Sequence, residues 1–218
     1  MKNEFFKRIL SSIIIIPIAL FFIIKGSFYF LFFLLGIFML VLYEWEKISK
    51  KKFYREFGII FLFFSLFTAY SLRGSTNVEL WNFLLILLIC VSTDIGGYIF
   101  GKILKGPKLT RISPKKTVAG MFGGFLLSII FVNIYLNYLS SIEKSNKLFQ
   151  INSENDLILV LSVSLVSQAG DIFVSYFKRK SKIKNTSNLI PGHGGLLDRI
   201  DGIIFAVPFS YLIFKFII

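Results

Sequence analysis

Three of the chain's five aspartates lie in one polar stretch, between Gly170 and Gly202 of an otherwise apolar sequence. They are Asp171, Asp198 and Asp201, and the basic residues around them are Lys178, Arg179, Lys180, Lys182, Lys184 and Arg199. Carboxylates are ligands that hard cations prefer, and Lys and Arg side chains bind phosphate oxygens. This combination indicates a site that binds a metal ion together with a phosphate group.

The three carboxylates are the predicted metal ligands. Asp171 stands about two helical turns before the Lys178–Arg179 pair, so one helix would carry a carboxylate at depth and cations at the membrane interface. Asp198 and Asp201 are three residues apart and share one face if a helix begins there. An alternative is that both merely cap that helix and pair with Arg199, but a cap needs only one acidic residue. Oxygen-only ligands favour Mg²⁺.

A second polar segment follows the predicted fourth span. Asp94 falls within or near the end of that span, where a charge is costly, and is therefore a further candidate metal ligand. Ser113 or Thr117 is expected to cap the fifth helix, whose amino end would add positive charge beside Lys115 and Lys116 and favour an anionic phosphate. The alternative is that these two lysines only anchor the helix at the lipid headgroups.

Apolar segments must position these residues. Apolar residues make up 55% of the 218-residue chain, Phe alone accounts for 27 of them, and several apolar runs approach the thickness of a bilayer. We therefore predict an all-α, polytopic membrane helical bundle. It forms a single membrane domain, 1–218, with amino-terminal helices in 1–80 and the catalytic half in 81–218. The predicted spans, about seven transmembrane helices, are 9–24, 27–43, 57–72, 81–100, 118–139, 157–176 and 202–218.

Basic residues are distributed unevenly between the predicted loops. If the amino terminus is cytoplasmic, twenty of the 25 Lys and Arg residues lie on the cytoplasmic side. This bias predicts a multi-pass protein of the cell (inner) membrane whose active site faces the cytoplasm. The net charge of +13 does not indicate a nucleic-acid partner, because the charge lies between spans and suits the anionic lipid bilayer.

Small and unique residues have mostly structural interpretations. Cys90 is the only cysteine and lies in an apolar run, so we expect a packing role. Gly120 and Gly124 have the spacing that lets membrane helices approach closely. His193, the only histidine, rules out a His-based triad; it either donates a hydrogen bond to a phosphate within its glycine-rich turn or is part of a purely structural turn. Ser175 precedes Lys178 by one helical turn.

The same polar residues resemble the signature of the phosphatidate cytidylyltransferase (CDP-diacylglycerol synthase) family. The matching positions are Ser175, Phe177, Lys178, Arg179, Lys184, Ser187, Ile190, Pro191, His193 to Leu196 and Asp198 to Asp201. The Ser-Pro-Lys-Lys-Thr segment, Ser113 to Thr117, resembles a cytoplasmic segment of that family. One position departs, because this chain has Asn185 where the family has Asp.

The resemblance implies attack of the phosphatidate phosphate on the α phosphorus of CTP, giving CDP-diacylglycerol and pyrophosphate. The predicted catalytic residues are Asp171, Asp198, Asp201, Lys178 and Arg179, of which all but Asp171 stand at positions of the signature. Substrate binding would fall to Ser113, Lys115, Lys116, Thr117, Ser175, Lys184, His193 and Arg199. The partners are then CTP, phosphatidate and the lipid bilayer, and positioning and charge neutralisation would supply most of the rate.

Rival functions are less well supported. A CDP-alcohol phosphatidyltransferase needs Asp-x-x-Asp-Gly-x-x-Ala-Arg, and the residues after Gly202 do not provide the Ala-Arg pair. A polyprenol kinase would also use CTP, but the spacing from Ser175 to Asp201 favours the cytidylyltransferase. An anion transporter would show an inverted repeat, and none is apparent. The chain is short for the family, which leaves open a minimal enzyme or a homodimer.

Overall fold

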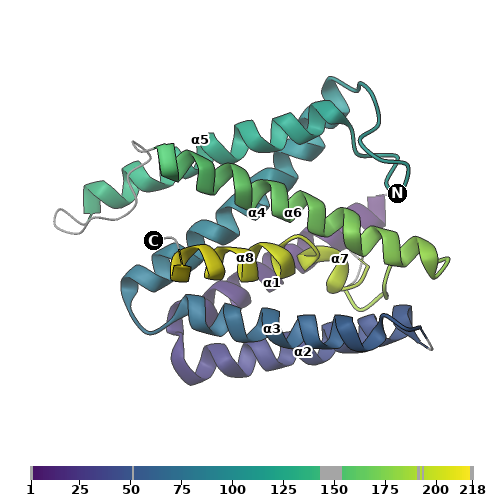
Figure 1. Cartoon of the computed structure of the whole chain (residues 1–218), viewed down its shortest axis with the longest axis horizontal. Helices are drawn as coiled ribbons and strands as arrows, with labels where there is room; N and C mark the ends of the chain where they lie inside the picture. Colours follow the sequence, from purple (N-terminus) through teal and green to yellow (C-terminus); the bar gives the residue numbers. More distant parts are fainter. Residues whose placement is uncertain (1, 51, 143–153, 191, 193, 217–218) are drawn as a thin grey trace.

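The protein is a bundle of α-helices. The computed structural model describes residues 2–50, 52–142, 154–190, 192 and 194–216, and this part of the chain contains no β-strand (Figure 1). The helices are α1 (Lys2–Lys25), α2 (Ser27–Ser49), α3 (Arg55–Arg73), α4 (Asn77–Ile103), α5 (Val118–Ile142), α6 (Glu154–Lys180), α7 (Leu197–Ile200) and α8 (Ile203–Phe216). The predicted all-α architecture is confirmed.

Five helices, α2 to α6, are long and apolar enough to cross a membrane. The first and seventh predicted spans correspond to shorter apolar helices, Ser11–Lys25 and Ile203–Phe216, among the described residues. Large apolar side chains such as Phe32, Phe57 and Ile134 are exposed on the bundle surface, as lipid contact requires. The chain is therefore a multi-pass membrane protein, and seven as the number of spans stays a prediction.

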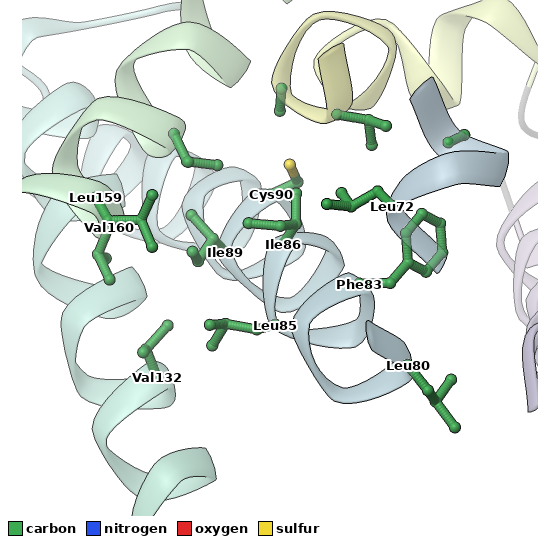
Figure 2. Packing of buried hydrophobic residues seen from close by; sticks show 14 of the residues in the cluster. Leu72, Leu80, Phe83, Leu85, Ile86, Ile89, Cys90, Val132, Leu159 and Val160 are labelled. Atoms are coloured by element: carbon green, nitrogen blue, oxygen red, sulfur yellow. The ribbon is translucent and has the colours of Figure 1, made fainter. Parts of the chain in front are cut away.

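Helix α4 lies at the centre and packs against α3, α5, α6 and α8. Its inward side chains include Ile86 and Ile89, both fully buried, which belong to one core cluster with Val132 of α5 and Val160 of α6 (Figure 2). Cys90 belongs to the same cluster and is 1% exposed. Its predicted packing role is confirmed, since the side chain is buried among the apolar residues of this cluster.

Glycines let α4 and α5 touch along their backbones. Gly96 faces the backbone of Gly123 and Gly124, and a Cβ on Gly120 would lie 2.7 Å from the carbonyl oxygen of Gly97. The close approach predicted from the spacing of Gly120 and Gly124 is confirmed. Asp94 lies on the same stretch of α4, is exposed, and interacts electrostatically with Lys116, which stands just before α5.

A second close contact joins α6 to the start of α8. Gly170 packs against the side chain of Phe205 and the backbone oxygen of Asp201, and Gly202 packs against Ser167. Any larger residue at these glycines would separate the two segments. The contact therefore brings Asp171, which follows Gly170, beside Asp201, which precedes Gly202.

The connecting segments gather at the two ends of the bundle. Figure 1 shows the α2–α3, α4–α5 and α6–α7 connections at one end and the α3–α4 turn at the other. The first group carries the basic segments that the sequence assigned to one face of the membrane. At the opposite end the buried Arg73 donates to the carbonyl oxygens of Ile23 (2.7 Å), Ile24 (3.1 Å) and Gly74 (3.0 Å), and so caps the last turn of α1.

Candidate active site

The two polar segments of the sequence meet at the start of α5. The Lys116 ammonium lies 2.5 Å from Oδ2 of Asp171, a carboxylate of α6, and both side chains are about a quarter exposed. Thr117 accepts a hydrogen bond from the Gly120 N–H (3.1 Å) and therefore caps α5. Of the two capping candidates the structure therefore selects Thr117, since Ser113 lies five residues before the start of α5, in a turn closed by the Lys116 N–H and the Ser113 carbonyl oxygen (3.0 Å).

Lys178 forms the second ion-pair cluster, which is more buried than the first. Its ammonium lies 2.8 Å from Oδ1 of Asp198 and 3.9 Å from Oδ2 of Asp201, and all three side chains are about one tenth exposed. The alternative in which Asp198 pairs with Arg199 is not what the structure shows. Arg199 is exposed and interacts electrostatically with Asp94.

Asp198 is held on both oxygens. Oδ1 accepts from Lys178, while Oδ2 accepts from the backbone N–H groups of Thr186 (2.9 Å) and Gly195 (3.2 Å). Burial on its own would raise the pKa of Asp198, but these hydrogen bonds and the Lys178 charge outweigh it, and the pKa lies below its ordinary value. This carboxylate is therefore fixed in position by the segment that precedes α7.

The other carboxylates interact with one another across helices. Burial, and then the negative charge of Asp171, raises the pKa of Asp201 well above its ordinary value, with a smaller contribution from Asp94. Asp94 also interacts electrostatically with Asp171 and Lys116. Within the described residues no three Asp, Glu, His or Cys side chains are grouped closely enough to hold a metal ion by themselves. The predicted ligands thus share one region without forming a complete cage.

The remaining predicted residues lie around this region. Ser175 donates to Oδ1 of Asp171 (3.3 Å) rather than to its own helix backbone. Arg179 is exposed and donates to the carbonyl oxygen of Ile183 (3.2 Å). Lys115 and Lys184 are exposed and have no ion pair with a described residue. His193 lies outside the described residues, so its predicted role stays a prediction.

The glycine-rich segment before α7 turns back on itself. Gly192 and Gly194 have φ values of 77° and 91°, which residues with a side chain rarely adopt. Ile190 and Gly194 exchange two backbone hydrogen bonds of 2.9 and 3.1 Å, which close the turn. Asn185 is exposed and lies beside Gly194 and close to the Asp198 side of the turn.

Glu44 is a site residue that the sequence analysis missed. It lies near the end of α2, is fully buried, and accepts four hydrogen bonds from residues more than 140 positions later. The available signal was a carboxylate at the very end of the apolar second span, which was predicted to stop at residue 43. In the sequence, however, Glu44 stands beside Glu46 and Lys47 and looks like part of an exposed interfacial end.

The fold and the site together define a class: a polytopic membrane protein whose lysine and aspartate side chains converge beside a glycine-rich turn at one end of the bundle. The chain belongs to the cytidylyltransferase family, whose model matches residues 6–78 and 57–217. The resemblance seen in the signature residues is confirmed by this match.

Relatives support the same assignment over nearly the whole chain. The phosphatidate cytidylyltransferase of Rickettsia bellii is 36% identical over 216 residues, covering 97% of this chain and 91% of the relative. That of Rickettsia prowazekii is 35% identical over 223 residues, covering 97% and 92%. The Thermotoga maritima protein of the same name is 32% identical over 160 residues, 73% of this chain and 58% of its own length. Relatives of similar length to this chain therefore exist.

Proposed function

We propose that this protein transfers the cytidylyl group of CTP to phosphatidate, giving CDP-diacylglycerol and pyrophosphate. The observation that carries the proposal is the convergence of Lys116–Asp171 and Lys178–Asp198 at one end of a membrane bundle of the cytidylyltransferase family. The family match does not favour the polyprenol kinase or the anion transporter. The reaction forms a bond between a phosphatidate oxygen and the α phosphorus and breaks the bond to the pyrophosphate oxygen.

The lysines supply the positive charge that two anionic substrates need. Lys116 stands one residue before the Thr117 cap, so the amino end of α5 adds its partial positive charge at the same place. Lys178 is balanced by two carboxylates in the structure, and phosphate oxygens can share its ammonium hydrogens. These groups would hold the triphosphate and the lipid phosphate in line and stabilise the charge that develops on the leaving pyrophosphate.

The carboxylates fit a magnesium site in which the protein supplies only one or two ligands. Mg²⁺ commonly takes one or two carboxylates and completes its shell with water and substrate phosphates. Asp171 and Asp201 offer such a pair, since they lie close together across the contact between α6 and the start of α8 and interact electrostatically. Asp94 and Asp198 are the further candidates. When bound, the ion would neutralise the triphosphate and orient its α phosphorus.

An apolar cavity beside the site supports a lipid substrate. A cavity of about 570 Å³ is bounded by α1, α2, α3, α4 and α8 and also by Leu189, Ile190, Leu196 and Ile200 of the segment that carries Asp198. Its volume falls within the usual range of pockets for small ligands. An acyl chain of phosphatidate would lie here with its phosphate directed toward Lys178. We further propose that the protein lies in the inner membrane, that its active site faces the cytoplasm, and that two copies of the chain form a homodimer.

The test is incorporation of labelled CTP into lipid by membranes that contain the protein. We expect a product that depends on added phosphatidate, disappears with EDTA and returns with magnesium. Membranes with the Asp198→Asn variant serve as the matched control and should form almost none. A labelled product without phosphatidate would contradict the lipid substrate, and full activity in metal-free membranes would contradict the magnesium site.

A further inference from the structure

Glu44 links the amino-terminal helices to the signature segment. Its Oε1 accepts from the Ser187 hydroxyl (2.5 Å) and the Leu196 N–H (2.9 Å), and its Oε2 accepts from the Thr186 hydroxyl and the Leu197 N–H (both 2.7 Å). The side chain is fully buried, and no Lys or Arg of the described residues forms an ion pair with it. A carboxylate in such a place depends on all its donors.

These four bonds hold both ends of one segment. Thr186 and Ser187 stand at its start, and Leu196 and Leu197 stand at its end, where α7 begins. A Cβ at Gly195 would collide with the Thr186 hydroxyl and lie 2.7 Å from Oε2 of Glu44. The carboxylate thus fills the space between the two ends and sets their separation.

The contacts continue from Glu44 to Asp198. The Thr186 hydroxyl lies 2.7 Å from Oε2 of Glu44 and 3.2 Å from Oδ2 of Asp198, so its single hydrogen serves two carboxylates. The Thr186 N–H donates to the same Asp198 oxygen. Because the other Asp198 oxygen binds Lys178, the position of Thr186 also determines where that ammonium lies.

We propose that Glu44 is a positioning residue, which acts through Thr186 to fix Asp198 and Lys178 for the cytidylyl transfer. This inference rests on the proposed function, because it needs Asp198 to act in that reaction. Glu44 itself is too deeply buried to meet a substrate. Through Glu44, α2 would contribute to catalysis although it lies outside the signature segment.

The first experiment replaces the carboxylate with an amide. Glu44→Gln keeps the size, but one of its two oxygens becomes an NH₂ group that faces a backbone N–H in either orientation. We expect turnover per folded molecule to fall tenfold or more, as when other outer partners of catalytic groups are removed. The KM for CTP should also rise, which a loss of folded protein alone would not cause. Ser49→Ala, which removes a buried hydrogen bond of the same helix, should change neither.

The second experiment separates positioning from stability and holds even where Glu44→Gln folds poorly. Thr186→Val removes the hydroxyl between the two carboxylates, whereas Thr186→Ser keeps it. Ser187→Ala removes one bond to Glu44 that does not continue to Asp198. We expect Thr186→Val to lower turnover and raise the KM for CTP several-fold, Thr186→Ser to restore both, and Ser187→Ala to affect mainly the melting temperature.

The possible outcomes test the proposed reaction and the positioning role of Glu44 separately. If the wild-type protein makes no labelled lipid, the proposed function fails and the role of Glu44 in it fails too. If the wild type is active and Asp198→Asn is not, while Thr186→Val matches Thr186→Ser in both constants, the positioning role alone is overturned. Equal losses of turnover in Thr186→Val and Ser187→Ala would also overturn it, because they would show that the bond from Thr186 to Asp198 has no effect of its own.

Discussion

A buried charged side chain lies at each end of α2. The one at its start is the cation Arg73 of α3, and the one near its end is the carboxylate Glu44 of α2 itself. At its start, Gly26 packs against Arg73, whose guanidinium donates to three carbonyl oxygens. Near its end, Glu44 accepts from two backbone N–H groups and two hydroxyls. The two positions are about 27 Å apart along the helix at 1.5 Å per residue.

Arg73 and Glu44 differ in whether their hydrogen-bond partners lead on to other side chains. The three bonds of Arg73 end on carbonyl oxygens of the backbone, so this end is explained by helix capping alone. The bonds of Glu44 continue through Thr186 to Asp198 and then to Lys178. A buried charge thus caps a helix at one end of α2 and, in our proposal, positions the site residues at the other, and burial by itself does not distinguish the two roles.

The largest effect is expected at the carboxylates of the catalytic end. Asp171→Asn, Asp198→Asn and Asp201→Asn each keep the shape of the side chain and remove its charge, so turnover should fall on the order of 10²-fold or more through misplacement of the bound triphosphate. Melting temperature and detergent-extracted yield should stay near wild type for Asp171→Asn and Asp201→Asn. Asp198→Asn should also lower the melting temperature, because it leaves the buried Lys178 ammonium without its nearest carboxylate, so its turnover is compared per folded molecule. Near-normal rates of all three variants at saturating magnesium would direct attention to Asp94 and the Ser113 to Thr117 segment instead.

The structural end should show the opposite pattern. Arg73→Met leaves buried carbonyl oxygens at the end of α1 without donors, which should lower the free energy of unfolding by about 2 kcal/mol or more. Turnover per folded molecule and the KM for CTP should remain within error of wild type. Lys25→Met, which removes an exposed cation at the same end, is the control for charge and should leave the melting temperature almost unchanged. A changed KM for Arg73→Met would remove the distinction between the two ends.

The smallest effect is expected at Asn185. This residue is exposed beside the glycine-rich turn, and Asn185→Asp restores the carboxylate of the family signature without a change of size. An exposed charge contributes little, so turnover should change by less than about fivefold and in the upward direction. Magnesium titrations of the two proteins measure the difference. Nearly complete loss of activity at normal expression would mean that the turn has been rebuilt around Asn.

The local composition of the sequence predicted most of the fold. Long runs of Phe, Ile and Leu predicted the membrane helices. The spacing of Gly120 and Gly124 predicted the α4–α5 contact, because residues four apart lie on the same face of a helix and both glycines leave room there for a second backbone. The ends of the bundle were harder to predict. The last predicted span begins with Gly202, but Asp201 and Gly202 form a turn that separates the four-residue α7 from a short α8.

The site was predicted in its parts but not in its pairings. The clustering of charges in one polar stretch selected Asp171, Asp198 and Asp201, and the distribution of basic residues placed Lys116 on the same face of the membrane. It did not indicate that Lys178 rather than Arg199 would pair with Asp198, since both cations are near in sequence and only packing separates them. The role of Glu44 could not be predicted for a related reason. Its hydrogen-bond partners lie more than 140 residues away, and the sequence pattern of α2 contains no information about them.

The length of α6 has a consequence for the depth of the reaction in the membrane. Its 27 residues extend about 40 Å, whereas the hydrocarbon core of a bilayer is about 30 Å thick. An excess of about 10 Å must be taken up by tilt or by projection of the ends, and both ends are polar, with Glu154 and Asp156 at the start and Lys178, Arg179 and Lys180 at the finish. We expect the end with the three cations to project into the headgroup region. Asp171 then lies near the boundary between lipid tails and headgroups, where a water-soluble nucleotide and a lipid phosphate can meet without either crossing the bilayer. Depth-dependent quenching of a probe at position 171 by labelled lipids would contradict this placement if it reported the bilayer midplane.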